Sequence, residues 1–348
     1  MRKKGLLISS LILALVLISS VLFSCTQPTP APVQPIELKF AHFLPPGGGP
    51  DPVWREWASK VESQTGGKVK FTFYPAEGLH KGREFHAAVT KGITDITLGV
   101  NVYDPTRFPL SLITDVPLMG WPDPVAVSAT AIFQKLYDKY PEIRNETKDV
   151  KLLTKLTFAP RNLHLANKKV ANIADLKGVK IGIGGMAAKT LEILGGTPIM
   201  IMPPDYAMSL ERGTIEGIAT SIGVIHQFKV LDLVPYHTDA DFGMNTMYLM
   251  MNLEKWNSLP TDVQKVINDL EPWLFQETMK AQEGFEQMAV DYAKGKNHTF
   301  VQLTPEQSQT WTNAAKPIHE QWVADTEAKG LPAKAVFEDT QRLIKEYK

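Results

Sequence analysis

The sequence predicts an α/β protein built from two lobes, and three observations point to this class. Short apolar runs of strand length alternate with amphipathic segments of helix length, an order that favours parallel sheets with right-handed crossovers. The chain has 348 residues, which exceeds one typical domain. Its content of 44% hydrophobic and 21% charged residues is ordinary for a globular protein. We therefore expect a globular protein with two hydrophobic cores, which is either exported or intracellular.

The N-terminal segment decides between those two locations. A basic triplet at residues 2–4 precedes the uncharged apolar run Leu6–Phe23, which is typical of an export signal. A transmembrane anchor is the alternative, because the run approaches the length of a membrane span. The sequence LFSC ending at Cys25 resembles the bacterial lipobox, so we expect a lipoprotein signal peptide over 1–25. Cys25 is the only cysteine, so no disulfide can form within the chain.

The first globular elements follow a Pro-rich tether over residues 26–35, TQPTPAPVQP, which is expected to be extended. The run Ile36–Phe43 alternates as a strand, and Pro45–Pro52 is expected to be a loop that cannot be helical. The next expected elements are a helix over Val53–Thr65, a strand over Lys68–Tyr74, a helix over Glu84–Thr90, a strand over Ile93–Val100 and a helix over Val125–Lys139.

A second β-α-β-α unit is expected between residues 172 and 217. After the strand-like run Lys151–Phe158, strands are expected at Val179–Ile183 and Pro198–Met202, on either side of a helix over Ala187–Leu194 that two glycines close. Asp205 is a good N-cap for the next helix. Because ligands bind beyond the carboxyl ends of parallel strands, we expect a site around 182–186 and 202–204.

The C-terminal part is expected to return to the first lobe and then become helical. Asn245–Asn252 is a candidate strand, and Thr261 with Gln264 forms the pattern of a capping box. Pro272 should kink or restart the next helix, because proline lacks a backbone donor. The helical pattern continues to about Gly295, and a late strand and two further helices complete the chain.

Several of these segments are similar to one known family. These segments resemble the solute-binding proteins of tripartite ATP-independent periplasmic (TRAP) transporters. They are DLKGVKI, LGGTPI and PDYAMSLERGTIEG in the second unit, KGITDITLG in the first, and MNLEKWNSLPTDVQKVI, with its spacing of tryptophan, leucine-proline and glutamine. The resemblance covers about residues 36–346. It implies a two-lobed periplasmic-binding-protein-like fold with crossover strands and a long C-terminal helix. The implied division is lobe I over 36–160, lobe II over 161–244, and a crossover strand with helices on both lobes over 245–348.

The resemblance also implies a function without catalysis or cofactor. The protein would capture a small organic solute, an organic acid, in a cleft between the lobes and deliver it to TRAP membrane permease subunits by hinge closure. It would be monomeric, periplasmic or extracytoplasmic, and held to a membrane by its lipid. A sensory lipoprotein that presents its ligand to a receptor is the alternative, and an exported enzyme is a third class. Nucleic acid is not expected as a partner, because no basic stripe carries interleaved aromatic residues.

Two motifs suggest other chemistry. Residues 182–187, GIGGMA, fit a dinucleotide fingerprint, but an exported protein meets little nicotinamide cofactor. The glycines are explained more simply by backbone amides that approach an anion at a helix N-terminus. His237, Asp239 and Asp241 share one face if they lie on a strand, which suggests either a cation site or a solvated polar face. No nucleophile motif of the G-x-S-x-G kind is present, and we expect no metal and no catalytic residues.

The candidate binding residues follow from the resemblance and from strand ends. The family arginine that pairs with the ligand carboxylate falls on Gly182, so either Arg161 replaces it or the ligand is bulkier, less anionic or held by backbone amides. A second family arginine position falls on Asn162 and the family asparagine on Thr220. Methionines near this unit are expected to be core or adaptable pocket wall. The full candidate set is His42, Phe43, Asn101, Tyr103, Arg161, Asn162, Gly182, Gly184, Gly185, Met202, Thr220, Phe242 and Asn245.

Overall fold

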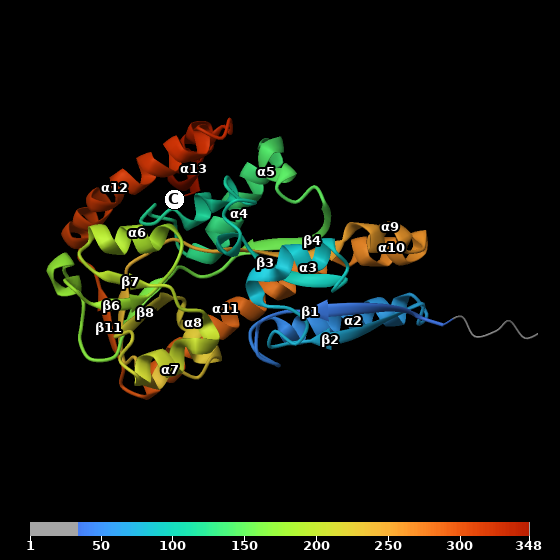
Figure 1. Ribbon diagram of the computed structural model, residues 1–348, viewed down its shortest axis with the longest axis horizontal. Coiled ribbons are helices and arrows are strands. Elements are labelled where there is room, and N and C mark those ends of the chain that lie inside the picture. The colour runs from blue at the N-terminus through green and yellow to red at the C-terminus, as the bar shows by residue number, and fades with distance from the viewer. Residues whose placement is uncertain (1–33, 348) are drawn as a thin grey trace, which may run out of the picture. The chain divides into compact units, whose positions relative to one another are not determined.

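The computed structural model describes residues 34–347, which include a compact unit that begins at Ile36. The expected signal peptide, the lipidation at Cys25 and most of the tether lie outside the described residues. Within 34–347, no helix combines the length and the apolar character that a membrane span requires. Two sheets organise this unit, and each forms the centre of a lobe (Figure 1).

The first lobe contains a five-stranded sheet that segments from both halves of the chain build together. Its first three strands are parallel, whereas the strand from the C-terminal half is antiparallel to both of its neighbours. The predicted return of the chain to this lobe is therefore confirmed. In spatial order the strands are β2 (Val69–Tyr74), β1 (Ile36–Ala41), β3 (Ile96–Val100), β10 (Thr246–Asn252) and β4 (Val150–Thr157).

The second lobe contains a six-stranded sheet around the β-α-β-α unit. The strand β6 is parallel to β7 and to β8, as the alternation of strands and helices predicts. In spatial order the strands are β11 (Thr299–Gln302), β9 (Tyr236–Asp239), β5 (Asn162–Leu165), β8 (Gly217–Thr220), β6 (Lys180–Gly182) and β7 (Thr197–Ile199).

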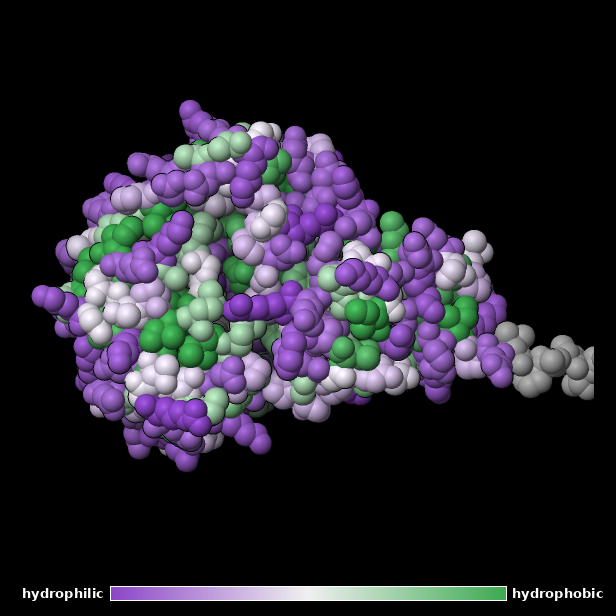
Figure 2. Space-filling model, in the orientation of Figure 1, coloured by the Kyte–Doolittle hydropathy of each residue, from purple (hydrophilic) through white to green (hydrophobic). Residues whose placement is uncertain are grey.

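Short helices cover the two sheets. Those of the first lobe are α2 (Asp51–Gln64), α3 (Phe85–Thr90), α4 (Val125–Lys139), α5 (Pro141–Asn145), α9 (Leu253–Ser258) and α10 (Thr261–Asp269). Those of the second lobe are α6 (Met186–Ile193), α7 (Tyr206–Glu211) and α8 (Ile222–Gln227). Hydrophilic residues interrupt the hydrophobic ones over the whole of the face drawn in Figure 2, as on an ordinary globular surface.

The C-terminal helices join the two lobes. The long helix α11 (Glu271–Gly295) runs between them in Figure 1 and contacts α2 and β4 of the first lobe and α8 of the second. The helix α12 (Pro305–Glu327) packs on α6, and α13 (Ala333–Tyr347) packs on both α12 and α4. The helix α11 therefore contacts elements of both lobes.

Most predicted element positions agree with the structure, and the differences lie at helix starts and strand ends: β7 stops at Ile199 instead of Met202, and β3 begins at Ile96 instead of Ile93. The helix over 125–139 has the predicted bounds, and α11 restarts with Pro272 in its first turn. The capping box at Thr261 is wrong, because Pro260 precedes the helix and Thr261 is already its first residue. Asp205 stands at the start of α7 without a side-chain capping bond. The loop predicted through Pro52 ends earlier, since α2 begins at 51 and accepts proline where no amide donor is needed.

Candidate functional site

A cavity of about 320 Å³ lies between the two lobes and receives residues from both. Its floor and walls come from the segments that follow β3, β4, β6, β7 and β8, together with one face of α11. The predicted location beyond the strand ends of the second sheet is therefore occupied by a cavity, as expected for α/β sheets. Its apolar lining includes Phe43, Val102, Tyr103, Phe158, Ile183, Ile201, Met202, Val224, Phe228 and Phe285.

Arg161 lines this cavity and is held by a dense set of contacts. It belongs to the link between β4 and β5, and its side chain is 6% exposed. Its Nε and Nη2 atoms donate to the Phe242 carbonyl at 3.3 and 2.9 Å, and Nη1 donates to Asn245 Oδ1 at 2.7 Å. Nη2 also pairs with Asp115. Four of the five guanidinium N–H groups thus have protein acceptors, and one on Nη1 is left at the cavity wall.

Asp115 connects this guanidinium to the second lobe. It is fully buried at the end of a short 3-10 helix, Ser111–Asp115, and its Oδ2 accepts a hydrogen bond from the Met186 amide at 3.0 Å. Gly185 has φ +68°, and a Cβ there would lie 2.7 Å from Asp115 Oδ2, so glycine permits this close approach. Burial raises the pKa of Asp115, and contact with Arg161 and the Met186 amide offsets part of the rise.

Two phenols enclose the same part of the cavity. Tyr103 packs edge-on against Phe43, with ring centroids 5.6 Å apart. Tyr206, the first residue of α7, is buried. Burial raises the pKa of Tyr103 well above its usual value and that of Tyr206 to about 12. Both phenols are therefore neutral at physiological pH and carry an O–H; that of Tyr206 lies beside the Thr220 side chain.

The wall formed by α11 carries Gln282, Phe285 and Glu286, and we call it the α11 wall. Gln282 is 6% exposed, and its Nε2 donates to the Thr157 carbonyl at 3.4 Å. Its Oε1 is buried and has no partner among the described residues. Glu286 Oε2 accepts from the Gly223 amide at 2.9 Å. Burial raises the pKa of Glu286, and the Ser221 hydroxyl and the Gly223 amide offset part of the rise.

The two lobes touch each other at the mouth of the cavity. Arg83 of the first lobe donates from Nε to Met202 Sδ of the second at 3.4 Å. Gln227, at the end of α8, lies over the loop before α2, where a Cβ added to Gly48 would be 2.4 Å from its Nε2. Because the glycines of this loop have no side chains, the loop leaves room for the side chain of Gln227.

The structure brings eight of the thirteen candidate residues to the cavity and leaves five outside. The first group comes from predicted strand ends and from the family resemblance, and that its members bind a ligand stays a prediction. These eight are Phe43, Tyr103, Arg161, Gly184, Gly185, Met202, Thr220 and Asn245. The other five are His42, Asn101, Asn162, Gly182 and Phe242.

Three of the five are polar residues whose side chains are used by their own surroundings. His42 Nε2 bonds to Asp51 at 3.0 Å. Asn101 donates to the Ser111 carbonyl at 3.0 Å and accepts from the Thr246 amide, also at 3.0 Å. The Asn162 side chain accepts from the amides of residues 240 and 241 at 2.9 and 3.2 Å. Each of them stabilises a loop behind the cavity wall.

The other two belong to the hydrophobic interior. Phe242 is fully buried and packs edge-on against Trp311. Gly182 does not line the cavity, because a Cβ there would meet Ile215 Cδ1 at 3.1 Å and Ile201 Cβ at 3.9 Å. Since Ile201 lines the cavity, Gly182 lies one layer behind the wall. A larger side chain at 182 would have to displace this packing.

The histidine of the predicted polar strand face has a different role. His237 is 3% exposed, and it joins His298 and His164 in a hydrogen-bonded chain, with N–N distances of 3.0 and 2.8 Å. His164 Nε2 then lies 3.0 Å from the carbonyl of Thr220, which only accepts. Each N–H must therefore point from His298 toward the cavity wall.

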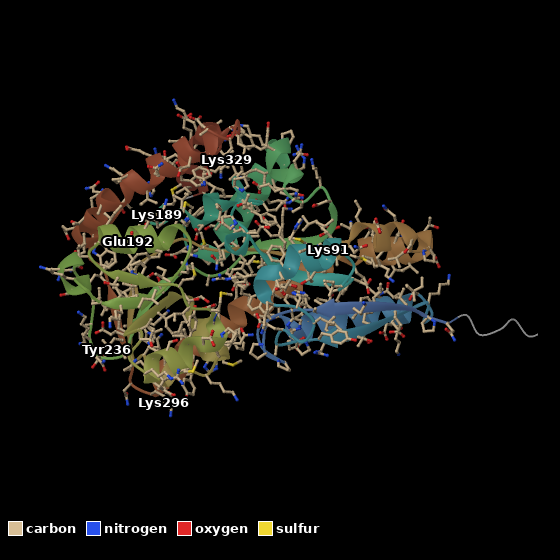
Figure 3. All side chains as sticks on the ribbon, in the orientation of Figure 1. Lys91, Lys189, Glu192, Tyr236, Lys296 and Lys329 are labelled. Atoms are coloured by element: carbon tan, nitrogen blue, oxygen red, sulfur yellow. The ribbon has the colours of Figure 1, made fainter. Side chains whose placement is uncertain are left out.

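This chain runs from the surface to the interior. Lys296 and Tyr236, close in sequence to His298 and His237, lie at the same side of the second lobe in Figure 3. Burial lowers the pKa of His164 to about 4, and burial together with the neighbouring imidazoles lowers that of His237 to about 3. Among residues 34–347, no group of three or more His, Cys, Asp or Glu side chains is arranged to hold a metal ion.

Comparisons with known proteins agree with this architecture. A family model described as bacterial extracellular solute-binding protein, family 7 (DctP), matches residues 48–326. The chain is 21% identical to the C4-dicarboxylate-binding periplasmic protein DctP of Rhodobacter capsulatus, over 91% of this chain and 95% of that protein.

Two solved structures extend the comparison. A TRAP periplasmic solute binding protein from Desulfovibrio salexigens, in an open complex, is 30% identical, covers 90% of this chain and 97% of its own, and has a TM-score of 0.77. A TRAP solute binding protein from a marine metagenome, specific for aromatic acid ligands and bound to 3-hydroxybenzoate, is 26% identical, covers 90% and 99%, and has a TM-score of 0.82.

Proposed function

Because the chain belongs to family 7 of the bacterial extracellular solute-binding proteins, the TRAP solute-binding proteins, we propose that it binds a bulky organic monocarboxylate between its lobes and delivers it to a TRAP membrane permease. The observation that carries this proposal is the single N–H of Arg161 Nη1 that remains at the wall of a largely apolar cavity. One directed donor beside an apolar volume suits one carboxylate attached to an apolar body.

The contacts of Arg161 support binding through a rigid anchor. Its guanidinium is already fixed by Asp115, Asn245 and the Phe242 carbonyl, so little side-chain freedom is lost when a carboxylate binds. Hydrogen bonds between charged partners are about twice as strong as neutral ones, and the closed cavity excludes competing water. The neutral phenols of Tyr103 and Tyr206 line the same cavity and supply further donors.

The rest of the cavity favours a bulky acid over a small dicarboxylate. Phe43, Phe158 and Phe285 give it aromatic walls. A second carboxylate would find no arginine at position 182. Arg83 lines the mouth of the cavity, where its Nε is bonded to Met202, and Glu286 on the α11 wall would repel a second anion when ionised. The similar structure with 3-hydroxybenzoate, at 26% identity, supports an aromatic acid as the first class to test.

Closure of the lobes would retain the solute. The contacts of Arg83 with Met202 and of Gln227 with the loop at Gly48 join opposite lobes across the mouth, so both must break when the lobes separate. A ligand that touches both walls would favour the closed state by its differential affinity.

Export and lipid attachment complete the proposal. The family is extracellular and the Rhodobacter relative is named periplasmic, which supports export of this chain. The LFSC sequence that ends at Cys25 supports a lipid anchor on an otherwise monomeric protein. Intact-mass measurement of membrane-extracted wild type and Cys25→Ser tests the anchor, which is excluded if both have the same unlipidated mass.

The binding proposal is tested with Arg161→Lys. Lysine keeps the positive charge beside Asp115 but loses the planar fork that reaches Asn245 and the cavity. We expect calorimetric titration to show wild-type binding of benzoate-sized monocarboxylates and roughly tenfold or greater weakening in the variant, as for loss of a charge-assisted bond worth about 1.5–3 kcal/mol. Arg342→Lys, at an exposed site on α13, is the matched control. Tight binding of C4-dicarboxylates, or unchanged binding by Arg161→Lys, would contradict the proposal.

A further inference from the structure

We infer that the α11 wall is a hydrogen-bond acceptor site, formed by Gln282 and Glu286, that selects acids carrying a second group with a hydrogen to donate: a hydroxyl or an ammonium. The inference rests on the proposed function, in which Arg161 binds the carboxylate of the same ligand. It adds a polar requirement at a second wall of the same cavity.

Gln282 supplies the first observation. Its amide orientation is set by the Thr157 carbonyl, which can only accept and therefore faces Nε2 at 3.4 Å. Oε1 is then the free acceptor: it is covered by protein atoms and has no partner among the described residues, and because Gln282 lines the cavity, a rotation of its side chain would present Oε1 to a ligand donor. Leaving a buried acceptor unpaired costs about 1–3 kcal/mol, so a ligand donor at this position is favoured.

Glu286 supplies the second observation, one helical turn further along α11. Residues four apart lie on the same face of a helix, so both side chains approach the cavity from the same wall. Glu286 accepts from the Gly223 amide at 2.9 Å, and the groups that favour its charged form, Ser221 and Gly223, are neutral donors. Burial favours the neutral carboxyl, and an ammonium donor of the ligand would favour the ionised form, whose roughly four acceptor positions exceed the two donors already present.

The charge of the cavity points the same way. The positive charge of Arg161 is balanced by Asp115 in direct contact, whereas Glu286 has only neutral donors beside it. The α11 wall therefore presents acceptors and partial negative charge to the ligand. A hydroxyl satisfies both residues, and an ammonium adds a Coulombic attraction to Glu286.

The test compares matched acids that differ only in the donor. One set is 3-methylbenzoate, 3-hydroxybenzoate and 3-(aminomethyl)benzoate, and a flexible set is hexanoate, 6-hydroxyhexanoate and 6-aminohexanoate. In calorimetric titration of the wild type, we expect at least one donor-bearing acid to bind tenfold or more tightly than its donor-free partner. Preference for the ammonium acids identifies Glu286 as the dominant group, and preference for the hydroxy acids identifies Gln282.

Variants on α11 assign the effect to these residues. Gln282→Met keeps the length and removes the acceptor, and Glu286→Gln removes the charge; each should reduce the preference for a donor at least fivefold. Glu283→Gln and Gln287→Met change exposed residues of the same helix and should leave the preference unaltered. If one variant fails to fold, the other variant, read beside the wild-type comparison, still decides.

The outcomes separate this inference from the proposed function. If donor-free acids bind the wild type as tightly as donor-bearing ones, and Arg161→Lys weakens them all, the acceptor site is overturned while the proposed function stands. If no carboxylate in either set binds, the proposed function fails, and the acceptor site fails with it. A donor preference that both α11 variants retain would assign the selection to another wall and overturn the inference.

Discussion

Asp115 and Glu286 are both carboxylates beside the same cavity, but only Asp115 has a cation in contact with it. Asp115 is joined to the Arg161 guanidinium and to the Met186 amide, and is fully buried. Glu286 receives only an amide and a hydroxyl from the start of α8. The side around Arg161 is thus electrostatically complete without a ligand, whereas the α11 wall is not.

This difference separates stability from selectivity. A buried ion pair with all partners in place holds the lobes and the anchor in one geometry, and removing one partner leaves an uncompensated charge. An acceptor wall with spare capacity contributes little to folding and favours whichever solute supplies the missing donor. The comparison therefore predicts that removing the charge of Asp115 and removing that of Glu286 change the free energy of unfolding by different amounts and in opposite directions.

The largest effect is expected for Asp115→Asn. The change leaves the buried Arg161 without its counter-charge, so the free energy of unfolding should fall by about 3–5 kcal/mol. Denaturant unfolding of the wild type and the variant measures the loss. Asp262→Asn breaks the exposed pair with Lys68 and serves as the control, with an expected change of about 0–1 kcal/mol. Equal losses in both variants would remove the distinction between buried and surface pairs on which the comparison stands.

The second largest effect is a loss of folding stability on acidification, which we expect from the histidine chain behind Thr220. The pKa of His164 is about 4 in the folded protein, below its usual value of 6.5, so the folded state takes up fewer protons. Its contribution to stability is complete above pH 6.5 and is lost as the pH falls toward 4, by about 3 kcal/mol. The charged groups nearest the outer histidine, Asp232 and Lys296, oppose each other in their effect on its pKa.

The same acid titration sharpens the contrast with the α11 wall. Burial raises the pKa of the Glu286 carboxyl, because the charged form is disfavoured inside the protein. The protonated carboxyl therefore stabilises the fold, and this stabilisation is lost as the pH rises through the pKa. Unfolding of the wild type and of His164→Gln between pH 7 and pH 4 checks the sign, because the variant should lose the steeper part of the acid dependence. Parallel pH profiles of the two proteins would mean that the histidine chain does not set acid stability.

The smallest effect is expected for Glu286→Gln at neutral pH. Removing a partly buried charge that has only neutral donors should change the free energy of unfolding by at most about 1 kcal/mol, in the stabilising direction. Thermal unfolding without ligand, with Glu283→Gln as the exposed control, measures it. A loss as large as that of Asp115→Asn would show that Glu286 has a structural counter-charge, and the two sides would then be alike.

The fold could be predicted from the sequence to a large extent because its signals are local. Helical spacing of apolar residues marked α2, the helical pattern marked the end of α11, and the alternation of strands with helices predicted parallel pairing of β6 with its neighbours. Strand ends likewise placed Tyr103 and Asn245 at an expected cleft, and both line the cavity. These inferences need only the periodicity of the chain and the known edge at which α/β sheets bind ligands.

The parts that could not be predicted depend on tertiary contacts. On a 25-residue helix, polar residues such as Gln282 and Glu286 look like a solvated face, and only the placement of α11 between the lobes turns them inward. His42 and Asn101 stand at strand ends as expected, but Asp51 and the Ser111 carbonyl occupy their side chains. For Gly182, the sequence shows the missing arginine but not the packing of Ile215 beside it.

The contact of Gln227 with the glycine loop at Gly48 has a consequence for the rates of exchange. Under the proposed closure, a solute enters the open cleft before this contact forms and leaves only after it breaks. Substitutions here would alter the dissociation rate more than the association rate, which is where related binding proteins mostly differ. The residence time of the solute can therefore be tuned at the mouth, by residues that need not touch the carboxylate and without changing which acid is recognised.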